Sequence, residues 1–246
     1  MKILLAPAKK MVENNDDFIY RDLPVFLKES SKLLETIRGL DFTTQKKMWK
    51  CNDKIAKENH KRFEEMNLKK NLSCALFSYV GLAYQHLAPN ALAEDSLEYL
   101  EENLRILSGF YGVLKPFDGI RAYRLEMQSE VPGVGSLYDY WGNKLYKEVT
   151  KKDHVIINLA SEEYFRAISP YLSDNDQCIT IVFGQKKGDK VIQKGTLAKM
   201  ARGEMVYWLA ENQISSPEDI KAFPYGYEYS KDLSTESEYV FLAKEM

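Results

Sequence analysis

The pattern of apolar and polar positions predicts an alternation of short buried strands and helices. Apolar runs that are bounded by Pro, Gly or charge predict strands at 2–6, 73–80, 104–107, 155–159, 177–183, 191–192 and 238–242. Apolar residues at helical spacing predict helices at 25–37, 43–66, 81–87, 96–103, 141–150 and 196–212, with short ones beginning at 161 and ending at 224. We therefore predict an α/β (mixed α+β) fold, in which helices flank a mixed central sheet with 238–242 at its edge.

A glycine-rich turn is the most distinctive local feature of the chain. Gly109 and Gly112 follow the predicted strand at 104–107 and allow a tight turn whose main-chain N–H groups a ligand could approach. Cations and an aromatic residue come directly afterwards: Lys115, Arg121, Tyr123 and Arg124. This combination suits a nucleotide or nucleic acid, although a tight turn in a buried core with solvated cations explains it equally well.

Single polar residues follow several predicted strands and helices. Lys9 comes just after the first strand, and Asn158, Ser161 and Glu163 come at the end of the strand at 155–159. Ser161 is the expected N-cap of the next helix, with Glu163 in its first turn. Lys199 and Arg202 lie one turn apart in the helix at 196–212. If these groups converge they form a mixed-charge pocket, and if they spread along a groove they form a track for phosphates.

Charge is unevenly distributed along the chain. The net charge is −2, so a nucleic-acid-binding role would have to rest on local patches. Residues 183–203 carry six basic residues and one acid, whereas the residues from 204 onward carry nine acids and three bases. The predicted helix at 43–66 is also basic, which indicates a solvated face or, alternatively, a phosphate contact.

The remaining composition excludes several classes of protein. The three cysteines and three histidines are scattered, which argues against a disulfide framework and a Cys/His zinc site: Cys51, Cys74, Cys178, His60, His86 and His154. No P-loop or dinucleotide fingerprint appears either, and we expect no cofactor. The first apolar run is too short for a secretory signal, and no stretch approaches the ~20 apolar residues of a membrane span. We therefore expect a cytoplasmic protein with no membrane contact. Repeats, linkers and composition breaks are absent, so we expect one domain over 1–246.

Five strings of residues resemble the YaaA family of peroxide-stress-resistance proteins. They are Leu-Ser-Gly-Phe-Tyr-Gly-Val-Leu-Lys-Pro at 107–116, Tyr-Arg-Leu-Glu-Met at 123–127, Ala-Pro-Ala-Lys at 6–9, Asn-Leu-Ala-Ser-Glu-Glu-Tyr-Phe at 158–165 and Lys-Met-Ala-Arg-Gly at 199–203. The resemblance implies a cytoplasmic DNA-binding protein that has a helix-hairpin-helix-like element in an unusual mixed α/β fold. It also implies protection against hydrogen peroxide and a lowering of free intracellular iron.

Two hypotheses for function follow. In the first, the chain binds duplex or junction DNA largely without sequence specificity and needs no obligate protein partner. The expected contacts are Lys9, Gly109, Gly112, Lys115, Arg121, Tyr123, Arg124, Asn158, Ser161, Lys199 and Arg202. In the second, it is an enzyme acting on a nucleotide or modified base, with Lys9 and either Glu126 or Glu163 as an acid/base pair. No His and carboxylate cluster has ligand spacing, so we predict no metal site and an indirect effect on iron.

Overall fold

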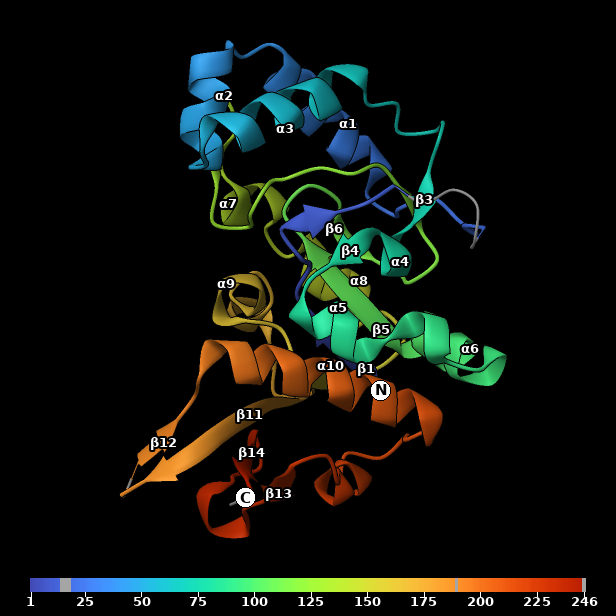
Figure 1. The fold of residues 1–246 in the computed structure, drawn as a ribbon, viewed down its shortest axis with the longest axis vertical. Coiled ribbons are helices and arrows are strands. Elements are labelled where there is room, and N and C mark those ends of the chain that lie inside the picture. Colours follow the sequence, from blue (N-terminus) through green and yellow to red (C-terminus); the bar gives the residue numbers. More distant parts are fainter. Residues whose placement is uncertain (14–18, 189, 245–246) are drawn as a thin grey trace.

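A mixed central sheet organises the computed structural model, which describes residues 1–13, 19–188 and 190–244 (Figure 1). Its strands follow the order β13-β14-β11-β10-β1-β5-β6, and β12 pairs with β11 beyond this path. Their bounds are β1 Lys2–Leu5, β5 Leu104–Ser108, β6 Gly112–Leu114, β10 Val155–Asn158, β11 Gln177–Lys187, β12 Lys190–Ile192, β13 Tyr227–Tyr229 and β14 Glu238–Ala243. Strands β5, β1, β10, β11 and β14 run parallel, whereas β6, β12 and β13 are antiparallel to their neighbours. The predicted mixed α/β architecture is confirmed.

The central strand β1 lies at the point where the chain reverses its direction of travel across the sheet. The chain passes from β1 to β5 on one side, and it later returns through β10 on the other side before continuing to β11. The loops that leave the carboxyl ends of β1 and β10 therefore diverge. In open parallel sheets, such a divergence leaves a crevice in which ligands commonly bind.

Helices cover both faces of this sheet. Their bounds are α1 Leu27–Arg38, α2 Phe42–Trp49, α3 Asp53–Glu65, α4 Ala75–Ser78, α5 Leu82–Leu87, α6 Glu94–Asn103, α7 Leu137–Trp141, α8 Lys144–Val149, α9 Glu162–Phe165 and α10 Gly195–Glu211. Short 3-10 turns occur at Pro89–Ala91, Ser169–Tyr171, Asp219–Ala222 and Lys231–Leu233. Two-residue strands pair outside the main sheet: β2 Lys10–Met11 with β4 Tyr79–Val80, β3 Ser73–Cys74 with β7 Gly119–Ile120, and β8 Glu130–Val131 with β9 Gly135–Ser136. Figure 1 shows α1, α2 and α3 grouped at one end of the molecule and β11 to β14 at the other.

The core is built on the parallel strands. Every residue of β1 is buried, and Ile3 and Leu4 are completely inaccessible. This explains why β1 and β10 appear in the sequence as continuous apolar runs rather than as alternating ones.

The predicted helix at 43–66 is wrong, because the chain forms two helices there. Lys50 adopts a left-handed conformation with φ of 47° and ends α2. The Asn52 side chain then accepts a hydrogen bond of 3.0 Å from the Ile55 N–H and caps α3. The result is a pair of helices joined by residues 50–52.

The predicted strand at 73–80 is also wrong. It is interrupted by the helical turn α4, in which the Ser78 hydroxyl donates back to the Cys74 carbonyl oxygen at 2.8 Å. The segment at 238–242 is a strand, as predicted, but it does not lie at the edge of the sheet. Residues 227–229 form β13, which pairs with β14 and covers it.

The glycine-rich turn lies between two strands, so it is not the helix-hairpin-helix-like element that the family resemblance implies. Strands β5 and β6 pair directly, with Ser108 opposite Gly112. A β-carbon on Gly109 would lie 2.4 Å from the Leu125 carbonyl oxygen, and Gly112 has a φ of +76°. The turn is buried as well: the Trp141 indole N–H donates to the Gly109 carbonyl oxygen at 3.0 Å.

Candidate functional site

A cavity of about 340 Å³ lies in the crevice at the carboxyl ends of β1 and β10. Its walls come from the loop after β1, the loop after β10, the start of α5 and one face of α10. They are made by Leu5, Ala6, Pro7, Ala8, Lys9, Val80, Gly81, Leu82, Ala83, Tyr84, Leu159, Ser161, Glu163, Tyr164, Lys199 and Arg202. Mostly apolar walls with a few polar groups are typical of small-molecule sites. The structure therefore brings together Lys9, Ser161, Glu163, Lys199 and Arg202, which are far apart in the sequence.

A close helix crossing positions the two cations of α10. Helices α5 and α10 pack together, and Gly203 allows them to touch because a β-carbon there would lie 2.0 Å from the Ala83 carbonyl oxygen. Lys199 and Arg202 are one turn apart and reach the cavity from the same side of α10.

Arg202 is the most unusual charged group in the cavity. Its Nε is buried and has no hydrogen-bond partner, and burial lowers the pKa of its guanidinium. Within the described part of the chain, neither Arg202 nor Lys199 has a carboxylate within ion-pair distance. Burying an unpaired charge destabilises a protein, so a bound anion would offset a cost that the free protein carries.

A second group of charges lies beside the cavity. The carboxylate of Glu126, 10% exposed, is 3.2 Å from the Lys9 ammonium and 3.0 Å from the Arg124 guanidinium. The Arg124 backbone is held by Asn59, which accepts from its N–H and donates to its carbonyl oxygen, each at 2.9 Å. Lys9 therefore pairs with Glu126 rather than with Glu163.

Two smaller hollows extend the cavity, and both include Lys9. One is lined by Lys9, Met48, Trp49, Lys50, Arg124, Glu126, Gln128 and Ser129. The other is lined by Pro7, Ala8, Lys9, Tyr123, Arg124, Leu125, Glu126 and Tyr164. The three hollows together contain five cations and two carboxylates, so this face is net positive in a chain whose net charge is −2.

The end of β10 supplies one structural side chain and two that reach the cavity. Asn158 is buried, donates to Thr180 Oγ1 at 3.2 Å and accepts from the Ala160 N–H at 3.0 Å, so its role here is to hold the loop. Ser161 is the residue before α9, as predicted, but no hydrogen bond from its side chain caps the helix. Glu163 accepts from the Gln128 N–H at 3.4 Å.

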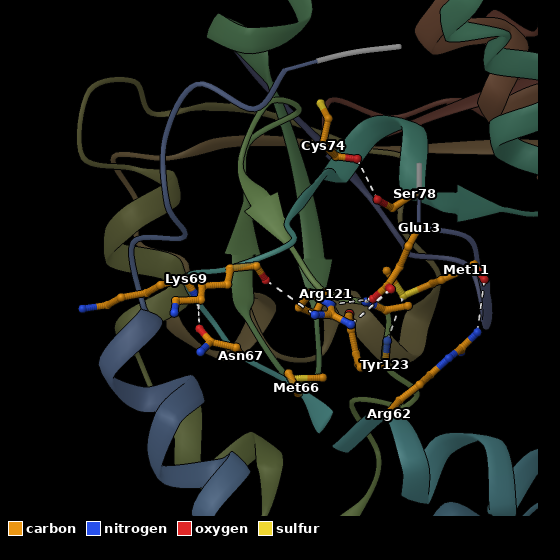
Figure 2. Close-up of polar contacts among 12 residues, drawn as sticks. Met11, Glu13, Arg62, Met66, Asn67, Lys69, Cys74, Ser78, Arg121 and Tyr123 are labelled. Atoms are coloured by element: carbon orange, nitrogen blue, oxygen red, sulfur yellow. Dashed lines mark hydrogen bonds and ion pairs between the residues drawn. The ribbon is translucent and has the colours of Figure 1, made fainter. Parts of the chain in front are cut away.

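The structure separates Arg121 and Lys115 from this site. The Arg121 guanidinium donates to both carboxylate oxygens of Glu13, at 2.7 and 3.2 Å (Figure 2). Lys115 follows β6, which runs antiparallel and carries it away from the carboxyl edge. It lies 3.8 Å from the Glu101 carboxylate. Each of these cations thus has its own counterion outside the three hollows.

The predicted contacts at the glycine turn are enclosed by protein. Gly109 and Gly112 are buried, and the N–H groups of Phe110 and Tyr111 donate to the Ser108 hydroxyl at 3.2 and 2.8 Å. Tyr123 is 4% exposed, and its hydroxyl lies 3.0 Å from that of Tyr79. The two glycines are thus enclosed by protein, whereas Tyr123, although mostly buried, lines one of the two smaller hollows.

Sequence reasoning missed Lys50, Tyr84 and Gly81 as parts of the site. Lys50 was assigned to the middle of the single helix predicted at 43–66. Asn52 followed by Asp53 is a recognisable helix start, and this signal could have placed Lys50 in a turn before a second helix. Burial raises the pKa of both Tyr84 and Tyr164 well above 10, so each is a neutral phenol at physiological pH. A proton acceptor in the cavity would therefore have to be a carboxylate or a lysine.

Two further kinds of feature are absent from the part of the chain that the structure describes, residues 1–13, 19–188 and 190–244. Within these ranges, no three His, Cys, Asp or Glu side chains form a group that could hold a metal ion. No helix in the same ranges has the length and apolar character needed to cross a membrane.

Comparison with known proteins identifies the family. Residues 1–233 match the family model described as peroxide stress protein YaaA. A protein of Agathobacter rectalis described as a UPF0246 protein is 47% identical over 99% of both chains. Similarly described proteins of Lachnoclostridium phytofermentans and Limosilactobacillus reuteri are 46% and 45% identical, over 100% and 98% of this chain and 97% and 98% of theirs. With a model match over nearly its whole length and relatives aligned from end to end, the chain belongs to the peroxide stress protein YaaA family.

Proposed function

We propose that this peroxide stress protein binds DNA through the face formed by the three adjoining hollows. The observation that carries the proposal is the excess of positive charge there: Lys9, Lys50, Arg124, Lys199 and Arg202 against Glu126 and Glu163. Nucleic acids bind mainly through their phosphates, and a local excess of cations provides the necessary attraction even when the whole protein is weakly acidic. We call this face the basic cleft.

The helix pair α2 and α3 provides a second argument. The short turn between these helices places Lys50 in the basic cleft beside Lys9 and Arg124. The turn between two helices presents backbone groups and side chains to a phosphate chain without reading bases. Affinity should consequently depend on DNA shape and salt rather than on sequence.

DNA held in this way would be shielded from oxidants, which fits a peroxide-stress role. We propose that any effect on free intracellular iron is indirect.

Fluorescence-anisotropy titrations with labelled duplex, four-way-junction and single-stranded DNA over a salt series test the proposal. Each phosphate contact contributes about 0.9 to the slope of log affinity against log salt. Lys50→Ala should therefore weaken binding and reduce that slope by about 0.9. Lys115→Ala is the control, because Lys115 is a partly exposed lysine that lies outside the three hollows. No binding at low salt, or equal losses in both variants, would refute the assignment.

A second candidate, an enzyme acting on a nucleotide or modified base, is favoured by the position of the cavity at the reversal point of the sheet. Lys9 and Glu163 both line it, while Glu126 lies 3.2 Å from the Lys9 ammonium. Turnover that Glu163→Gln abolishes without weakening DNA binding would support this candidate. Absence of turnover with nucleotides and damaged DNA would remove it.

A further inference from the structure

The 340 Å³ cavity has features that point to a ligand of its own, distinct from a DNA backbone lying along the cleft. A backbone track needs only an open surface, whereas this cavity recedes between α5, α10 and the loop after β10 and is lined mainly by apolar groups. Its volume falls at the lower end of the range typical of small-molecule pockets. It is therefore large enough for one mononucleotide and too small for a duplex.

The charges in the cavity specify an anionic group. Arg202 brings a guanidinium with a buried, unpartnered Nε, and Lys199 adds a second cation one helical turn away. The planar donor fork of arginine matches the oxygens of a phosphate, and the bonds it makes are charge-assisted. These two residues form the phosphate-binding wall of the cavity.

The remaining walls suit a ring with polar edges. Tyr84 and Tyr164 contribute aromatic surface, and the loop after β1 adds short apolar side chains. Ser161 and Glu163 bring a hydroxyl and a carboxylate that could bond to the edge of a base or to a sugar hydroxyl. An anion, a flat ring and a hydrogen-bonding edge together describe a nucleotide.

We propose that the cavity binds a single nucleotide unit, with its phosphate on Arg202 and Lys199 and its base against the apolar walls. The unit has two possible sources: a free nucleoside monophosphate, or one nucleotide turned out of a DNA strand that lies in the basic cleft. Lys9 lines both the cavity and the adjoining hollows, so a strand in the cleft passes the mouth of the cavity. Only the second source rests on the proposed DNA-binding function.

The experiment uses the full chain, the four deoxynucleoside monophosphates up to millimolar concentration, and a duplex carrying 2-aminopurine at a mismatch. Isothermal titration calorimetry detects the free nucleotide. A rise in 2-aminopurine fluorescence on binding detects a base that has left the stack. Anisotropy on the same duplex reports independently whether DNA is bound.

Arg202→Met is the diagnostic variant, and Lys32→Met, which changes an exposed lysine of α1, is its control. Because methionine removes a half-buried charge that has no ion-pair partner while filling similar space, Arg202→Met should raise the melting temperature by about 2 °C or more. It should also weaken nucleotide binding about tenfold or more. An arginine with a purely structural role would give the opposite change in melting temperature.

The outcomes separate the two proposals. Binding of a monophosphate, or a fluorescence rise, that Arg202→Met weakens about tenfold or more and Lys32→Met leaves intact would establish the nucleotide site. DNA binding by anisotropy with neither signal overturns the nucleotide site and leaves the cleft proposal standing. Monophosphate binding without DNA binding overturns the cleft proposal and identifies the free nucleotide as the ligand. A fall in the melting temperature of Arg202→Met, with nucleotide binding unchanged, also overturns the site.

Discussion

Glu126→Gln separates the electrostatic role of the basic cleft from its structural role. The Glu126 carboxylate neutralises two cations at once, Lys9 at 3.2 Å and Arg124 at 3.0 Å. A phosphate that approaches either cation must compete with this carboxylate. Glutamine removes the negative charge but keeps an oxygen that can still accept a hydrogen bond from Arg124. The variant should therefore bind DNA more tightly and be less stable.

The expected changes in DNA affinity and in stability can both be worked out from the geometry. If the two released cations both contact phosphate, the salt slope steepens by up to about 2, since each contributes about 0.9. Between 50 and 200 mM salt, each added contact should enlarge the loss of affinity by about threefold. The Arg124 and Glu126 side chains are only 17% and 10% exposed. Removing a buried partner costs about 3–5 kcal/mol, and because the glutamine oxygen retains a hydrogen bond we expect a loss of about 2 kcal/mol.

Anisotropy over a salt series measures the salt dependence of DNA affinity, and urea unfolding followed by fluorescence measures the free energy of unfolding. Glu218→Gln is the control, because Glu218 also pairs with a lysine, Lys221, but is exposed and lies outside the three hollows. It should leave both measurements unchanged. Unchanged or weaker DNA binding by a folded Glu126→Gln variant would refute the assignment of DNA to this cleft.

Three further predictions concern the frame of the site. Burial raises the pKa of Asp118 to about 7, so the folded state holds a proton that the unfolded state loses above about pH 4. The stability that this bound proton provides is present at low pH and is lost as the pH rises to 7, at a cost on the order of 4 kcal/mol. Asp118→Asn should therefore reduce the pH dependence of the free energy of unfolding in urea between pH 4 and 7, and an unchanged pH dependence would contradict this. Gly203→Ala should destabilise the protein by about 3 kcal/mol in urea unfolding, because its β-carbon meets the Ala83 carbonyl oxygen; wild-type stability would show that the helices shift freely. Trp141→Phe should cost about 1–3 kcal/mol by leaving the Gly109 carbonyl oxygen without its indole donor, and thermal unfolding at the wild-type temperature would disprove it.

The sequence predicted those parts of the fold whose causes are local. Strand β1 and strand β10 could be found because strands buried on both faces need continuous apolar runs. The predicted helix at 43–66 failed because its break depends on the left-handed conformation of a lysine, a residue that usually continues a helix. The strand predicted at 73–80 failed because tertiary hydrogen bonds, such as that from the Ala75 N–H to the Asp118 carbonyl oxygen, turn the chain there.

Half of the candidate site was predictable by a general rule about sheets. Lys9, Ser161 and Glu163 follow buried strands, and the carboxyl ends of parallel strands meet at one edge. The approach of α10 could not be predicted, because it depends on the contact of Gly203 with α5, about 120 residues away in the chain. The glycine turn was predicted to contact a ligand because glycines permit the close approach of a ligand or of other protein groups. In the structure it is protein, residues 125–126, that lies against the turn.

Whether a cation is available to a ligand is a tertiary property, and this decides how the basic residues of the chain should be read. Arg121 looked as suitable for phosphate as Arg202 did, but Glu13, 108 residues distant in the chain, neutralises it. Arg202 has no such partner among the described residues, although its Nε is buried. Because an unpaired buried charge lowers stability, its presence in a cavity needs a compensating role. Binding an anion supplies that role, and the opposite expected effects of Arg202→Met on stability and on binding follow from the same unpaired charge.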